Sequence, residues 1–178
     1  YLHIVDVQSG TISSLTPRKE RKVSRGMARF GADMTKVYFT DDFDGEYQQL
    51  CQLDLSSGVR RVLTPESRWD VEEFDVSPTG DIVAFVKNEA GYGRLHLLDL
   101  NTGEKDTPEL PMGRISQLHW RSNGIELGFS LNAADSPGDV YSLNRTTGKL
   151  DRWTEAPLHG IDAKSLVRPS LIKTPSFD

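Results

Sequence analysis

The side chains of this chain that could bind a metal or act as a general base are scattered along it. Its four histidines, at positions 3, 96, 119 and 159, show no His-x-x-x-His or similar ligand spacing. The single cysteine, Cys51, lies in the aliphatic segment 50–54, and one cysteine cannot form an intrachain disulfide or a zinc site built on several thiolates. We expect Cys51 to be a buried structural thiol, since free cysteine packs like a small apolar side chain.

Two acidic segments could bind a ligand. Asp41–Glu46 resembles the start of a calcium loop but lacks the spaced ligands and the closing glutamate of an EF-hand. An Asp-Gly pair within it favours a solvated hairpin tip. Glu72 and Glu73 are adjacent, and the alternation of a strand would point their side chains in opposite directions. The lone Gly91-x-Gly93 has no following helix to form a nucleotide loop, so the sequence predicts no cofactor.

A serine nucleophile of the α/β-hydrolase type is not expected in this chain. Such a nucleophile needs Gly-x-Ser-x-Gly at a sharp turn from strand to helix. The nearest segment, Gly128–Asn132, lacks the second glycine and lies within an expected strand. The chain also shows no alternation of helices and strands, so these residues alone are predicted to hydrolyse nothing.

A repeated phrase shows which elements position these side chains. An aliphatic strand ends in Asp or Asn, a short polar turn leads to Gly, and another strand follows; the copies are 6–10, 54–58, 99–103 and 144–148. The turn glycines recur at intervals of about 45 residues, and strands flank every turn. That period is typical of the blades of a β-propeller.

A second landmark precedes each turn by about 25 residues. Phe30, Phe74 and Leu118 are 44 positions apart, and each stands before a short turn and a strand. The clearest of these turns is Ser77–Asp81, where Pro presets φ and Gly accepts a positive φ. Each unit is therefore interpreted as four antiparallel strands, placed in one unit near 71–77, 82–88, 94–100 and 103–107.

The predicted fold is all-β: a partial β-propeller of about three and a half four-stranded antiparallel blades. The half blade covers 1–17, and the full blades cover 25–65, 70–110 and 114–155, which places the propeller in residues 1–156. A ring usually has four to eight blades, so we expect a piece of a larger protein. Two blade faces would lack a neighbour, and we expect them to drive self-association. Residues 157–178 are expected to form a strand, at 166–173, and a linker.

The composition excludes some classes of partner. The net charge is −5 with the two signs interspersed, whereas a nucleic-acid site needs a clustered basic face. No apolar run approaches the roughly 18 residues of a membrane span. We therefore expect neither nucleic acid nor a membrane as a partner, and the compartment stays open.

The sequence motifs of the blades resemble a known repeat. Aliphatic-Asp-x-x-x-Gly, Ser-Pro-x-Gly and a closing Leu-Thr-Pro (63–65) resemble TolB-like propellers. The ending Ser176-Phe177-Asp178 resembles the junction between the propeller and the hydrolase in the prolyl oligopeptidase family of serine peptidases. That resemblance implies a non-catalytic propeller that caps an α/β-hydrolase domain, absent here, and restricts the access of large peptide substrates.

The resemblance also implies which residues could meet a substrate. Arg29, Glu73 and Gln117 are expected to face the central channel. A pair of propeller glutamates binds the substrate's amino terminus in dipeptidyl-peptidase relatives, so Glu72 joins the candidates although alternation argues against a joint site. His119 is a candidate because one TolB-like branch, the oligogalacturonate lyases, uses a histidine-rich metal site. Two alternatives remain: a TolB-like protein-binding scaffold, and a propeller lyase.

Overall fold

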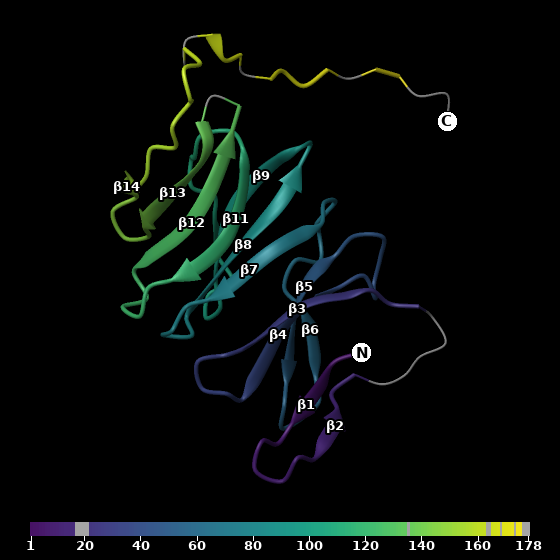
Figure 1. The fold of residues 1–178 in the computed structure, drawn as a ribbon. Helices are drawn as coiled ribbons and strands as arrows, with labels where there is room; N and C mark the ends of the chain where they lie inside the picture. Colours follow the sequence, from purple (N-terminus) through teal and green to yellow (C-terminus); the bar gives the residue numbers. More distant parts are fainter. Residues whose placement is uncertain (17–21, 135, 163–164, 168, 173, 176–178) are drawn as a thin grey trace.

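The computed structural model describes residues 1–16, 22–134, 136–162, 165–167, 169–172 and 174–175. These residues form four antiparallel sheets in chain order, one with two strands and three with four, so the predicted all-β fold is confirmed (Figure 1). The described residues contain no helix long and apolar enough to cross a membrane.

Every sheet is a meander in which consecutive strands pair. The two-stranded sheet consists of β1 (His3–Val5) and β2 (Ile12–Ser14). The second sheet consists of β3 (Arg25–Phe30), β4 (Lys36–Asp41), β5 (Gln49–Asp54) and β6 (Arg60–Val62). The third consists of β7 (Val71–Val76), β8 (Ile82–Glu89), β9 (Tyr92–Asp99) and β10 (Lys105–Asp106). The fourth consists of β11 (Arg114–Trp120), β12 (Glu126–Ala133), β13 (Ser136–Asn144) and β14 (Leu150–Arg152).

The repeated turn phrase is one local structure used several times. The Asp54 carboxylate accepts hydrogen bonds from the backbone N–H groups of Ser56 and Ser57 at 3.0 and 2.8 Å. Gly58 then takes a φ of +69°, which a residue without a side chain adopts most readily. The same carboxylate-to-amide pattern recurs at Asp6 and Asp99, and an amide oxygen replaces the carboxylate at Asn144.

Three apolar layers hold the sheets face to face. The layer between β7–β10 and β11–β14 is the largest and includes Val86, Leu97, Trp120 and Phe129. A second layer, with Phe74 and Phe85 at its centre, joins β3–β6 to β7–β10, and a smaller one joins β1–β2 to β3–β6. Both faces of the β7–β10 sheet are therefore covered, which explains the near-continuous apolar run at 82–86.

The landmark that we placed at Phe30, Phe74 and Leu118 is wrong for its first member. Phe74 and Leu118 are buried at 1% and 6% exposure, whereas Phe30 is 44% exposed. The strand pairing gives the reason: Phe30, the last residue of β3, pairs with Val37, the second residue of β4, as Val76 pairs with Val83 and Trp120 with Leu127. The interval from Phe30 to Val76 is thus 46 residues, although the interval from Val76 to Trp120 is 44.

The strand expected at 166–173 is not found among the described residues, whose last strand is β14. A strand needs a partner for its backbone groups, and no strand pairing among the described residues involves this segment. Val167 and Ile172 are instead 82% and 80% exposed. Figure 1 shows the chain after β14, in yellow, passing over the end of the sheets where the β8–β9 and β12–β13 hairpins lie.

Candidate functional site

β3, β7 and β11 are the first strands of the three four-stranded sheets. β7 lies beside both β3 and β11. Each of the three strands contains a shift in pairing register, which marks one extra residue. Such bulges bend a strand and free backbone groups from the ladder, so these strands have N–H groups that need other acceptors.

Glu73 supplies acceptors for the bulge of the next sheet. Its two carboxylate oxygens accept hydrogen bonds from the backbone N–H groups of Gln117 and Leu118, both at 2.8 Å. Gln117 has a φ of +59°, the sharpest point of that bulge. The carboxylate thus bridges two sheets, and most of its acceptor capacity is committed to the protein itself.

Asp75 makes a second bridge between the same two strands. Its carboxylate accepts the backbone N–H of Trp120 at 2.9 Å, and its carbonyl oxygen accepts the indole N–H of that residue at 3.2 Å. We call Glu73 and Asp75 together the β7 clamp. Asp75 was absent from our sequence predictions, because nothing local distinguishes a bridging aspartate from a solvated one.

The five predicted channel residues have different surroundings. Glu72 is exposed and accepts a hydrogen bond from the Asn88 side chain at 3.0 Å, so it and Glu73 bind different partners. Gln117 is exposed, and its side-chain oxygen accepts a hydrogen bond from the Ser130 hydroxyl at 2.8 Å. Arg29 is exposed on β3, where the strand pairing makes it the counterpart of Asp75 rather than of Glu73. The positions that form the β7 clamp are therefore occupied on β3 by Met27 and Arg29.

His119, the fifth residue, lies on β11 with its side chain 87% exposed and Nδ1 3.7 Å from Asp75 Oδ2. Within the described ranges, no group of three or more His, Cys, Asp or Glu side chains is placed to hold a metal ion. The structure therefore brings His119 beside one carboxylate that already serves the β7 clamp.

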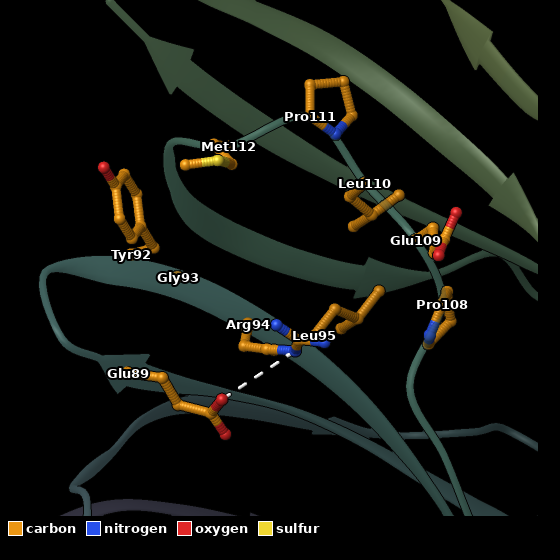
Figure 2. A pocket seen from close by; sticks show the side chains of 10 residues that line it. All are labelled: Glu89, Tyr92, Gly93, Arg94, Leu95, Pro108, Glu109, Leu110, Pro111 and Met112. Carbon is orange, nitrogen blue, oxygen red and sulfur yellow. Dashed lines mark ion pairs between the residues drawn. The ribbon is translucent and has the colours of Figure 1, made fainter. Parts of the chain in front are cut away.

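A pocket that the sequence did not predict lies at the hairpin end of the third sheet. It has a volume of about 380 Å³, and its walls are the β8–β9 hairpin and the connection from β10 to β11, residues 108–112. Figure 2 shows Tyr92 and Met112 on one side of it, Pro108 and Glu109 on another, and the ion pair of Glu89 with Arg94, at 3.8 Å. A mostly apolar lining with a few charged groups is usual for a ligand pocket.

His96 contacts Glu89, one of the residues that line this pocket. Its Nε2 is 3.1 Å from the Glu89 carboxylate, its Nδ1 is 3.1 Å from the Thr107 hydroxyl, and its ring stacks on Phe85 at 5.0 Å. Burial of the ring, together with the nearby Lys87 cation, lowers the pKa of His96. A neutral imidazole then holds Glu89 in place.

The chain after β14 passes this pocket. The Tyr92 hydroxyl donates a hydrogen bond to the carbonyl oxygen of Pro169 at 3.2 Å. The residues that follow the last sheet therefore lie on the same side as the pocket and the β8–β9 hairpin (Figure 1). The final phrase that suggested a junction with a hydrolase, 176–178, lies outside the described residues.

A buried charged cluster beneath the β4–β5 hairpin also differs from expectation. Asp41, which we placed in a solvated hairpin tip, is fully buried and bonds Arg60 Nη2 at 2.6 Å, with Arg25 Nε 3.8 Å away. Cys51 is buried as predicted, and burial and the Asp41 charge raise the pKa of its thiol to about 12. This thiol is a packing group and a poor nucleophile.

No protein-family model matches this sequence, and no curated protein matches it either. Solved structures do match. TolB from Acinetobacter baumannii aligns with 88% of this chain at 20% identity and a TM-score of 0.70. A puromycin-hydrolyzing peptidase of Mycobacterium tuberculosis aligns with 93% at 20% identity and a TM-score of 0.73, and a structure from a study of two prolyl endopeptidases aligns with 87% at 14% and 0.71.

These similarities establish the fold. The chain is a partial β-propeller of the kind found in TolB and in prolyl endopeptidases, which confirms the architecture that the blade phrases predicted. It spans 38% of the TolB structure, 26% of the puromycin-hydrolyzing peptidase and 22% of the prolyl endopeptidase. At these identities the likeness extends to the course of the backbone and not to particular side chains.

Proposed function

We propose that this chain is a non-catalytic propeller segment that caps the active site of a prolyl-oligopeptidase-like serine peptidase and limits access to peptides. One observation carries the proposal: the chain leaves its last sheet on the side that holds the 89–112 pocket, and Tyr92 binds it there. A hydrolase domain joined at that end would therefore face the pocket and the hairpin tips. The propeller fold shared with two kinds of peptidase structure supports the same role.

The geometry suggests how such a cap works. The β7 clamp holds two neighbouring sheets together along their first strands, so we expect an opening beside it to resist widening. A folded protein would be excluded there, while an extended peptide could reach the pocket by Tyr92 and Arg94. Chemistry would come from the hydrolase domain, and the propeller would select by size.

A fluorophosphonate probe tests this function because it labels activated serines covalently. A longer chain carrying these residues is compared with the 178-residue chain alone. We expect one labelled serine downstream of residue 178 in the longer chain, and no labelling of the 178 residues. A folded longer chain without a labelled serine, or specific labelling of Ser130, would overturn the proposal.

The second candidate is a TolB-like scaffold that binds a protein partner. It is favoured by the match to TolB, whose coverage of this chain (88%) and TM-score (0.70) are close to those of the peptidase matches. The probe separates the candidates: a scaffold stays unlabelled at every length. In that case the pocket by Tyr92 is the first surface to examine for a bound peptide.

A further inference from the structure

Two sheets approach each other closely at the 89–112 pocket. The backbone N–H of Gly93, which lines the pocket, donates a hydrogen bond to the Gly113 carbonyl oxygen at 2.9 Å. A Cβ atom at Gly93 would lie 2.7 Å from the backbone nitrogen of Ile115, and one at Gly113 would collide with the Asn132 carbonyl oxygen. β9 is therefore held against the start of β11, and we expect the pocket to keep its shape when it is empty.

The apolar part of this pocket is open to water. It is formed by Leu95, Pro108, Leu110, Pro111 and Met112. Met112 is 57% exposed, and Figure 2 shows it on the same side of the pocket as Tyr92. The charged lining residues are Glu89, Arg94 and Glu109, which leave one net negative charge. Covering such a lining with an aliphatic segment that carries no negative charge is favourable.

Residues 169–172, which we call the strap, contact the pocket through one hydrogen bond. The Tyr92 hydroxyl donates it to the carbonyl oxygen of Pro169 at 3.2 Å. No strand pairing among the described residues involves the strap. Leu171 and Ile172 are 54% and 80% exposed. Two large aliphatic side chains therefore stand in water close to a point that is fixed at the pocket.

The strap can reach the apolar lining from that point. Leu171 and Ile172 follow Pro169 by two and three residues, which an extended chain spans in about 7 and 11 Å. The proline ring presets φ at Pro169, so the strap loses less conformational entropy when it docks. Residues 163–175 contain two lysines and one arginine and no acidic residue, so their charge is opposite to that of the lining.

We propose that the strap is a tethered ligand of the 89–112 pocket, in which Leu171 and Ile172 dock on the apolar lining and keep other peptides out until the strap is displaced. The inference rests on the proposed function for the role of the pocket in binding peptides, and it adds a form of control to that role. A strap that occupies the pocket about nine-tenths of the time weakens peptide binding about tenfold, because a peptide binds only the free fraction.

The direct test measures binding of a fluorescent peptide of residues 167–173 to the 178-residue chain by anisotropy. Leu171→Asp combined with Ile172→Asp disables the strap, and we expect this variant to bind the peptide at least tenfold more tightly than the unaltered chain. Val167→Asp is the matched control, because Val167 is 82% exposed, as Ile172 is 80% exposed, but lies outside the strap. Equal affinity of the unaltered chain and the strap variant, or no binding to the strap variant, would overturn the proposal.

A second pair of variants shows whether the peptide occupies this pocket. In the strap variant, Met112→Asp should weaken peptide binding at least tenfold. Val59→Asp is its control, because Val59 is 62% exposed in the turn after β5, and Met112 is 57% exposed. Unchanged circular dichroism establishes that both variants fold. Equal binding by the two variants would place the peptide elsewhere and overturn the proposal.

A spin label at position 170 reports on the strap within its own chain. Ser170→Cys supplies the thiol for the label, since Cys51 is buried and the pKa of its thiol is about 12. We expect the broad spectrum of an immobilised label, which Met112→Asp or an excess of the unlabelled peptide narrows. A narrow spectrum at the outset, or a broad one that neither change affects, would overturn the proposal.

These results and the fluorophosphonate result fail independently. Strap-controlled peptide binding in a protein whose longer chain has no labelled serine would reject the peptidase cap and keep the strap. A labelled serine downstream of residue 178, with no effect of the strap variant on peptide binding, would reject the strap and keep the cap.

Discussion

Removal of the Glu73 carboxylate is expected to loosen the contact between β7 and β11. The carboxylate accepts two backbone N–H groups of β11 at 2.8 Å each, and Glu73→Ala leaves both without a protein acceptor. A hydrogen bond to a charged group contributes about 1.5–3 kcal/mol when shielded from water. Glu73 is only partly buried, so water replaces some of this contribution. We therefore expect a loss of about 2 kcal/mol in the free energy of unfolding.

Thermal and urea unfolding followed by circular dichroism measure this loss. For a chain of this size, about 2 kcal/mol corresponds to a fall in Tm of roughly 4–8 °C. Glu73→Gln keeps one acceptor oxygen and should lose about half as much. The adjacent Glu72→Gln is the control, because Glu72 is exposed and accepts a hydrogen bond from the Asn88 side chain rather than from a backbone group of another sheet, and it should change stability by less than about 0.5 kcal/mol. Equal effects of the Glu72 and Glu73 variants would refute the clamp.

Three further predictions concern single side chains. The pKa of His96 lies below its ordinary value of 6.5, so the unfolded chain binds more protons than the folded one, and stability should fall as pH drops below about 6.5. His96→Gln should flatten this pH dependence of stability in urea titrations, and an unchanged slope would contradict the prediction. Arg145→Ala removes the 2.7 Å ion pair with Asp81 of the neighbouring sheet and should cost about 1 kcal/mol in thermal unfolding, with Arg121→Ala as a more exposed control. The Cys51 thiol, with a pKa of about 12, should react with a thiol reagent only when denaturant is added, and prompt labelling in buffer would show that the thiol is accessible.

The repeat and its strands could be predicted because their signals are local. Within five residues, Asp54 and Gly58 supply the carboxylate acceptor and the positive φ that a tight turn requires. The strands predicted at 71–77, 82–88 and 94–100 agree with β7, β8 and β9 to within about two residues. Aliphatic runs between such turns have few other ways to satisfy their backbone groups.

The candidate site could not be predicted because its contacts cross between sheets. The hydrogen bonds of the β7 clamp join residues 44 or 45 positions apart, and a bulge of one residue decides which N–H groups they reach. The pocket by Tyr92 likewise depends on where the connection at 108–112 crosses the sheet, which no local motif encodes.

The misplaced landmark shows how a small error in register changes the chemistry inferred for a site. A uniform spacing of 44 residues aligns Arg29 with Glu73, whereas the strand pairing aligns it with Asp75. On β3, Arg29 therefore occupies the position that Asp75 holds on β7, and Met27 occupies the position of Glu73. An arginine offers no acceptor to an N–H group. The contact of β3 with β7 must therefore rely on the apolar layer around Phe74 and Phe85, whereas β7 and β11 are joined by hydrogen bonds as well.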